Sequence, residues 1–306
     1  MSILSIENLS KQYGPVRALK SVSFTVPKGT VFGILGPNGS GKTTLLGIVT
    51  DILKASSGQY KWHGDLDMAD QRKKIGTLLE TPNFYHYLSA IDNLKIAAEI
   101  KQRGKDDIRK VLELVNLWQR KDSKFSTYSL GMKQRLAIAS TLLGDPDILV
   151  FDEPTNGLDP AGIAEIRELM KKLHQQGKTI IMASHILDEV EKVCTHVAII
   201  QKGDLKTVGT VKDIMSSPGG KTTTAVLIEI ASDNNILLQQ TVQQISGIVN
   251  IELSGDELHI TCSESISAAQ INRFCFDKEI VLTKLNVKRK SLETTFLEIT
   301  GNQSDK

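Results

Sequence analysis

Residues 36 to 43 read Gly36-Pro37-Asn38-Gly39-Ser40-Gly41-Lys42-Thr43. This run matches the pattern G-x-x-x-x-G-K-[ST] in full, between an apolar strand predicted at Val31–Leu35 and helix-compatible residues from Lys42. Glycines let consecutive backbone N–H groups surround phosphates, and a helix N-terminus adds partial positive charge. The run therefore predicts a nucleotide phosphate site, with Lys42 on the β- and γ-phosphates, Thr43 on Mg²⁺ and Thr44 near the α-phosphate.

A second apolar run, Ile148–Phe151, is followed by Asp152 and Glu153. An acidic residue at the end of a strand beside a phosphate loop can hold Mg²⁺, which is the predicted role of Asp152. Glu153 is predicted to act as general base on the attacking water. The alternative is an acidic pair that only caps the next helix, and the phosphate loop earlier in the chain argues against it.

Further short strands are predicted along the first two thirds of the chain. Thr179–Ala183 and Val197–Ile200 are apolar throughout, Ser21–Val26 alternates between polar and apolar residues, and Ala161–Gln175 has the apolar spacing of an amphipathic helix. Buried strands that alternate with such helices are typical of an α/β fold with a parallel-sheet core.

A domain boundary is predicted at the linker-like stretch Ser216–Gly220, which divides the chain into residues 1–216 and 217–306. All five tyrosines and all eight prolines lie at or before Pro218. The second part is predicted to have the order β-α-β-β-α-β, a ferredoxin-like order, followed by a last helix that begins from Ser291 as N-cap. These elements are Thr224–Ile230, Asn234–Ile245, Gly247–Leu253, Glu257–Cys262, Ser265–Phe276, Ile280–Val287 and Leu292–Thr300.

Composition excludes several classes of protein. A chain of 306 residues suggests about two domains, and 40% hydrophobic with 24% charged residues excludes wholesale disorder. A net charge of +2 is too balanced for an electrostatic nucleic-acid binder, so no nucleic acid partner is expected. No signal peptide or membrane-spanning run is expected from the residue pattern, and three scattered cysteines predict neither a disulfide framework nor a zinc site. We expect an intracellular protein whose contact with a membrane goes through another chain.

The stretch Tyr128-Ser129-Leu130-Gly131-Met132-Lys133-Gln134-Arg135 resembles the signature sequence of ATP-binding cassette (ABC) proteins. Gly157-Leu158-Asp159-Pro160 resembles their D-loop, Ser184-His185 their switch histidine, and Tyr13 stands where an aromatic residue stacks on adenine. The chain is identified as a member of this family from about residue 2 to residue 216.

The resemblance implies a parallel-sheet core with an antiparallel β subdomain and a helical subdomain, and it implies ATP hydrolysis with Mg²⁺. His185 is then expected to bond the γ-phosphate, and Ser129 is expected to N-cap the helix Gly131–Leu143. Ser129, Gly131 and Asp159 would act across a head-to-tail homodimer or heterodimer of ABC subunits, because signature residues bind nucleotide held on the opposite chain. A separate multi-span membrane permease is implied, with this chain peripheral on the cytoplasmic face of the membrane.

Three positions depart from the family pattern. Leu130 stands where a signature glycine is usual, Met132 where glutamine is usual, and Glu80 where a glutamine touches Mg²⁺ or the attacking water. Glu80 is therefore a candidate ligand of the metal and of the nucleotide. The stretch around Glu80 and the signature resemble ATPases of bacitracin- and lantibiotic-type exporters, which implies export.

Several alternatives stay open. The chain could be a soluble ABC ATPase without a transport role, or a regulatory subunit that binds ATP without hydrolysing it. The aromatic run at residues 82–88 is either local core packing or a docking surface for the membrane subunit. The transported substrate is not encoded here. The remaining histidines are expected to be ordinary surface or partly packed residues: His63, His86, His174, His196 and His259.

Overall fold

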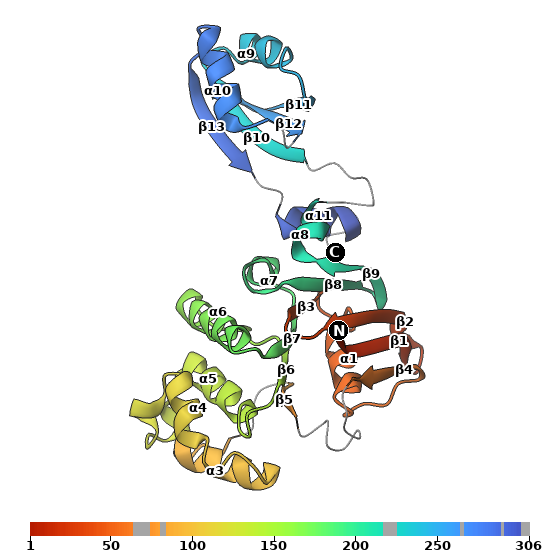
Figure 1. Cartoon of the computed structure of the whole chain (residues 1–306), viewed down its shortest axis with the longest axis vertical. Helices are drawn as coiled ribbons and strands as arrows, with labels where there is room; N and C mark the ends of the chain where they lie inside the picture. Colours follow the sequence, from red (N-terminus) through yellow and green to blue (C-terminus); the bar gives the residue numbers. More distant parts are fainter. Residues whose placement is uncertain (64–73, 80–83, 217–224, 264–265, 289–290, 301–306) are drawn as a thin grey trace. The chain divides into compact units, whose positions relative to one another are not determined.

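The computed structural model describes residues 1–63, 74–79, 84–216, 225–263, 266–288 and 291–300 (Figure 1). The chain divides into two compact units, Met1–Val211 and Lys212–Lys306. Helix α8 (Val211–Ser216) begins at this division. Glu80 and most of the predicted linker lie outside the described residues.

The first unit is built on a sheet of six strands. Four of them are parallel strands predicted from apolar runs, and every residue of β3 and β7 is buried. Adjacent strands pair in parallel from β5 through to β8, and only β9 runs antiparallel to β8. The predicted α/β fold with a parallel-sheet core is confirmed. The strand order is β5 (Ile75–Leu78), β6 (Ile148–Asp152), β7 (Thr179–Ser184), β3 (Val31–Leu35), β8 (His196–Gln201) and β9 (Asp204–Thr210).

A second, antiparallel sheet has the order β2 (Val16–Pro27), β1 (Ser2–Tyr13) and β4 (Ser57–Trp62). Strand β2 is longer than the predicted Ser21–Val26, because its pairing with β1 continues to the turn, where Tyr13 faces Val16. Helix α1 (Lys42–Val49) contributes buried residues to the core that it shares with both sheets. Phe24 and Phe32 stack across this core with ring centroids 5.4 Å apart.

The remaining helices of this unit form two groups (Figure 1). One comprises α3 (Ala90–Lys101), α4 (Ile108–Leu114) and α5 (Leu130–Thr141). The other comprises α6 (Pro160–Gln175) and α7 (Leu187–Val193), and α7 packs so closely on β3 that a Cβ at Gly33 would lie 2.9 Å from Val190 Cγ1. Within the described part of the chain, no helix combines the length and the apolarity needed to cross a membrane.

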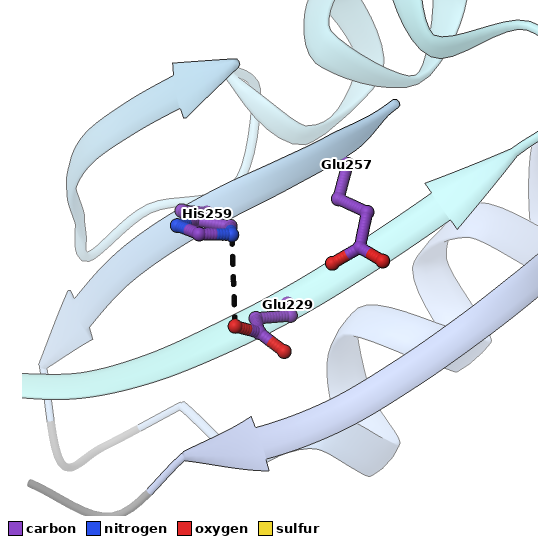
Figure 2. Close-up of side chains that lie close together, drawn as sticks. All are labelled: Glu229, Glu257 and His259. Carbon is purple, nitrogen blue, oxygen red and sulfur yellow. Dashed lines mark ion pairs between the residues drawn. The ribbon is translucent and has the colours of Figure 1, made fainter. Parts of the chain in front are cut away.

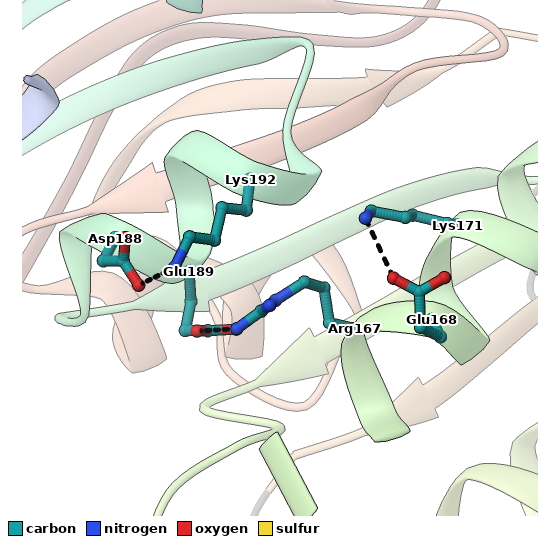
Figure 3. A network of polar contacts seen from close by, with 6 residues as sticks. All are labelled: Arg167, Glu168, Lys171, Asp188, Glu189 and Lys192. Atoms are coloured by element: carbon teal, nitrogen blue, oxygen red, sulfur yellow. Dashed lines mark hydrogen bonds and ion pairs between the residues drawn. The ribbon is translucent and has the colours of Figure 1, made fainter. Parts of the chain in front are cut away.

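A buried ion pair joins α6 to α7 (Figure 3). Arg167 Nε lies 3.1 Å from Glu189 Oε2, and Arg167 Nη2 lies 2.6 Å from Glu189 Oε1. The hydrogen bonds to Glu189 raise the pKa of Arg167. The Glu189 side chain is only 4% exposed, so its charge depends on this bidentate partner. Helix α7 begins two residues after His185, and the pair therefore helps to fix the segment that carries this histidine.

We expect Arg167→Met to lower the free energy of unfolding of this unit by about 3 kcal/mol, because the Glu189 carboxylate would stay buried without its partner. Both tryptophans, Trp62 and Trp118, lie in this unit, so their fluorescence during urea unfolding reports it selectively. Lys171→Met is the matched control, since Lys171 forms an exposed pair with Glu168 and should cost less than about 1 kcal/mol. If the two variants lost the same unfolding free energy, the pair of Arg167 with Glu189 would not have the predicted stabilising effect.

The second unit contains a four-stranded antiparallel sheet with the order β11 (Ile248–Ser254), β12 (Glu257–Ser263), β10 (Ala225–Ser232) and β13 (Leu282–Lys288). Helix α9 (Asn235–Val242) follows β10, and α10 (Ala268–Asp277) follows β12. The chain order is thus the β-α-β-β-α-β order expected from the sequence. Both helices pack their buried residues against one face of the sheet, in a core that includes Leu238, Ile260 and Ile271.

The boundaries of this unit's helices follow from their caps. Helix α10 begins later than the predicted Ser265, because Ser267 and Gln270 form a capping box that sets its first turn. The last helix, α11 (Leu292–Thr300), begins as predicted after Ser291, whose Oγ accepts a hydrogen bond from Thr294 N at 3.2 Å.

Candidate functional site

Three segments with polar side chains meet at one edge of the six-stranded sheet. The phosphate loop follows β3, Asp152 and Glu153 end β6, and His185 follows β7. These strands are neighbours in the order β6-β7-β3 and run parallel. Their carboxyl ends therefore lie together, where α/β sheets commonly bind ligands.

The loop between β3 and α1 has a backbone that only glycine accommodates. Gly39 and Gly41 have φ of 75° and 107°, a region that other residues rarely adopt. A Cβ at Gly36 would lie 2.1 Å from Ile200 O, and one at Gly41 would lie 2.4 Å from Ala18 O. The backbone is thus open to a ligand on its outer side, where Asn38 and Gly39 are exposed.

Lys42 is held inside this loop. Its side chain is 5% exposed, and Nζ donates hydrogen bonds to Gly36 O at 2.8 Å and to Pro37 O at 3.2 Å. Nζ also lies 3.4 Å from Glu153 Oε1. The loop therefore surrounds a buried ammonium group, a charge suited to phosphate oxygens.

Glu153 bridges the lysine and the histidine. Its Oε2 lies 2.8 Å from His185 Nδ1, which is within hydrogen-bond distance. Glu153 has φ of 47°, the left-handed region, and its N–H donates to Ala183 O at 3.0 Å. A non-glycine residue there costs about 1–2 kcal/mol, and such strain persists where the surrounding fold enforces it, often at functional sites. The predicted trio Lys42, Glu153 and His185 is brought together.

The site also contains oxygen atoms suited to a divalent cation. The Thr43 hydroxyl lies in the exposed first turn of α1, and Asp152 ends β6 beside Glu153. Hydroxyl and carboxylate oxygens are ligands that Mg²⁺ prefers, so the residues present fit the ion. Ser40 Oγ is buried and, within the described residues, has no hydrogen-bond partner, which leaves a polar atom in the loop for a ligand.

Tyr13 and Thr44 occupy the margins of the site. Tyr13 ends β1 with 45% of its surface exposed, and Lys11 Nζ lies 5.0 Å from the centroid of its ring. An exposed ring beside a cation is a platform on which a base can stack. Lys11 was missed by the sequence reasoning, although its spacing of two residues from Tyr13 on a strand places both on one face. Thr44 is half-buried in α1.

The signature and D-loop residues start helices. Ser129 is the N-cap of α5, as predicted, and its Oγ accepts a hydrogen bond from Met132 N at 3.3 Å. Asp159 is the N-cap of α6, where its Oδ1 accepts from Gly162 N at 2.9 Å. No hydrogen bond or ion pair within the described residues joins Ser129, Gly131 or Asp159 to the Lys42 trio. One chain therefore leaves these two groups separate.

The segment before Ser129 is anchored by Tyr128. This side chain is 4% exposed, and its hydroxyl donates to Arg120 O at 2.7 Å. Burial raises the pKa of Tyr128. The residue after Ser129, Leu130, is 50% exposed, although it is apolar. The buried Tyr128 side chain thus holds the chain in place directly before the exposed first turn of α5.

The described residues of the aromatic run differ in how far they are buried. Phe84 packs edge-on against buried Phe125, with ring centroids 5.2 Å apart. Tyr85 and Tyr87 are 50% and 68% exposed and contact each other at 6.0 Å. Residues 82 and 83 lie outside the described residues. The two tyrosines leave an exposed aromatic pair beside the helical group.

Known proteins resemble the chain closely. A sequence model of the ABC transporter family matches residues 19–156. An uncharacterized ABC transporter ATP-binding protein of Bacillus subtilis (strain 168) is 37% identical, over 99% of this chain and 98% of its own length. The bacitracin transport ATP-binding protein BcrA of Enterococcus faecalis is 33% identical, over 98% of this chain and 96% of its own length.

A lantibiotic transport ATP-binding protein of Streptococcus pyogenes, SrtF, is 39% identical over 66% of this chain and 89% of its own length. Among solved structures, an ATP-binding cassette of an ABC transporter in its ADP conformation has a TM-score of 0.63 and 28% identity, covering 71% of this chain and 96% of its own. A dimeric cassette in a post-hydrolysis state with ADP and Pi has a TM-score of 0.59 and 27% identity, covering 68% and 98%.

Proposed function

The chain belongs to the ABC transporter ATP-binding proteins, which bind and hydrolyse ATP, and from this membership we propose that two such chains close head to tail on ATP and drive a separate membrane subunit. The main structural support for ATP hydrolysis is that Glu153 contacts both Lys42 and His185 at the ends of parallel strands. A base, a phosphate-binding cation and an orienting imidazole are the groups that ATP hydrolysis needs.

Each residue of the trio has a proposed role. Lys42 exchanges its bonds to the carbonyls of Gly36 and Pro37 for bonds to phosphate oxygens. Glu153 accepts a proton from the attacking water, while His185 holds the carboxylate through Nδ1 and bonds the γ-phosphate. The backbone N–H groups of residues 36–44 bind the remaining phosphate oxygens, and Tyr13 stacks on adenine. Thr43, Asp152 and Glu80 would hold Mg²⁺, which would neutralise charge on the phosphates when bound.

The second half of each site comes from another chain. Ser129 and Gly131 lie at the exposed start of α5, where an anion is favoured by the free N–H groups and by the helix dipole. We propose that they contact the γ-phosphate on the opposite subunit, with Asp159 beside them. The dimeric cassette among the similar structures supports this arrangement. The partner is a copy of this chain or a related subunit.

The membrane subunit is proposed to dock on Tyr85 and Tyr87. Exposed aromatic side chains are preferred anchors of protein interfaces, and these two contact each other at the surface. Relatives named for bacitracin and lantibiotic transport support a role in export. The chain would then work as a peripheral protein on the inner face of the membrane.

A photo-crosslinking residue at position 87 tests this docking in cells that express the chain. We expect adducts with a multi-span membrane protein, and no such adducts from position 16, which is also exposed (61%) but lies on the antiparallel sheet. Adducts only with water-soluble proteins would instead favour the alternative of a soluble ABC ATPase without a transport role.

A further inference from the structure

The face of the four-stranded sheet opposite α9 and α10 carries a cluster of two carboxylates and an imidazole (Figure 2). Glu229 lies on β10, and Glu257 and His259 lie two residues apart on β12. Residues at this spacing project from the same face of a strand. Glu229 pairs directly with His259 in the register of the two strands, which places all three on one face.

The three residues are close enough to share a metal ion after their side chains adjust. One ligand atom from each of the three residues can be chosen so that all lie within 4.8 Å of one another. His259 Nε2 lies 3.6 Å from Glu229 Oε1, which is too long for a good hydrogen bond. Two ligands about 2.05 Å from a tetrahedral Zn²⁺ lie about 3.4 Å apart, so this pair needs to shift by only a few tenths of an ångström.

One lysine contacts both carboxylates of the cluster. Lys284 Nζ lies 2.7 and 2.6 Å from the two carboxylate oxygens of Glu257 and 3.3 Å from Glu229 Oε2. The hydrogen bond to Glu257 raises the pKa of Lys284. Glu229 is 4% exposed, and a buried carboxylate is stabilised by nearby positive charge.

Lys284 can leave the cluster without disrupting the sheet. Its side chain is 39% exposed, and it lies opposite the small residue Ala231, over which it reaches Glu257. Asn286 Nδ2, 3.3 Å from Glu229 Oε2, stays to orient the buried carboxylate. An incoming dication therefore competes with a partly exposed ammonium group rather than with a buried one.

We propose that Glu229, Glu257 and His259 bind a divalent first-row transition metal, with Zn²⁺ the best fit, and that Lys284 is the counter-ion it displaces. Zn²⁺ binds imidazole nitrogen together with carboxylate oxygen, whereas Mg²⁺ and Ca²⁺ favour sites made of oxygen alone. The site uses none of the three cysteines, all of which are buried. The bound ion would link β10 to β12 and stabilise the second unit.

The test is a calorimetric titration of the chelator-treated, nucleotide-free full chain with Zn²⁺, supported by the visible absorption of bound Co²⁺. His259→Ala and Glu229→Gln should each weaken the binding at this site at least about tenfold, since each removes a ligand. His259 is partly exposed, so its variant should fold even if the buried Glu229 does not tolerate change. His174→Gln is the matched control, because His174 bonds Gly29 O in the first unit and should leave the titration unchanged.

Lys284→Met distinguishes a metal site from an ordinary charge network. Removal of the competing cation should tighten Zn²⁺ binding roughly tenfold, because a unit charge a few ångströms from a dication is lost. The proposal is overturned if the chain binds no Zn²⁺, or if His259→Ala binds Zn²⁺ as tightly as the parent. It is also overturned if Lys284→Met does not tighten the binding.

Discussion

Glu153→Gln is expected to lower the rate of ATP hydrolysis by about 10²–10⁴, the usual contribution of a general base, while ATP stays bound. The amide keeps the shape of the side chain but cannot accept the proton of the attacking water. It also removes a negative charge that would face the γ-phosphate, so ATP should be held at least as well. Because hydrolysis is needed to reset the closed state, Glu153→Gln with Mg-ATP should accumulate an ATP-loaded dimer in size-exclusion chromatography.

Lys42→Ala is the matched contrast to this variant. Lys42 is proposed to neutralise phosphate charge before and during the reaction, so its loss should abolish most ATP binding as well as hydrolysis. No ATP-loaded dimer is then expected. Phosphate release and equilibrium binding of a fluorescent ATP analogue separate the two effects. Parental hydrolysis by Glu153→Gln would show that Glu153 is not the base.

A mixture of two inactive variants should regain activity if each site is shared between chains. Ser129→Arg places bulk and charge at the start of α5 but leaves Lys42 intact, whereas Lys42→Ala leaves Ser129 intact. A mixed dimer holds one site with an intact loop facing an intact signature. Up to about a quarter of parental activity should return, because half of randomly formed dimers are mixed and each has one complete site of two.

The controls for this experiment are each variant alone and the parental protein measured over a range of concentrations. Each variant alone should hydrolyse ATP at a small fraction of the parental rate, at all concentrations. The specific activity of the parent should rise with protein concentration unless the second unit holds a constitutive dimer, which sedimentation would reveal. Parental activity in Ser129→Arg alone would contradict a shared site.

Local sequence patterns were sufficient for much of the fold. The strands β3, β6 and β7 were predicted nearly to the residue, because short continuous apolar runs are typical of the buried strands of a parallel sheet. The N-caps Ser129 and Ser291 were predicted because a hydroxyl that accepts from the first turn of a helix is a local interaction. The loop at residues 36–43 was likewise predicted, since the positive φ values of Gly39 and Gly41 are a local requirement for glycine.

Other features depend on pairings between distant parts of the chain. The placement of β7 between β6 and β3 puts His185 within 2.8 Å of Glu153, and no local pattern specifies the order of strands in a sheet. The left-handed backbone of Glu153 is likewise accompanied by a hydrogen bond to Ala183, which lies on the distant strand β7. The sequence therefore determined which groups the nucleotide site contains, and the packing of the sheet determined their contacts.

The cluster of Glu229, Glu257 and His259 also combines a local sequence pattern with a strand pairing that the sequence does not specify. From the sequence His259 was expected to be an ordinary surface or partly packed residue, although its alternation with Glu257 placed both on one face of a strand. Glu229 joins them only because β10 pairs with β12 in a register that sets it opposite His259. A shift of that register by one residue would turn Glu229 to the other face, and register is fixed by which side chains the core of the sheet buries.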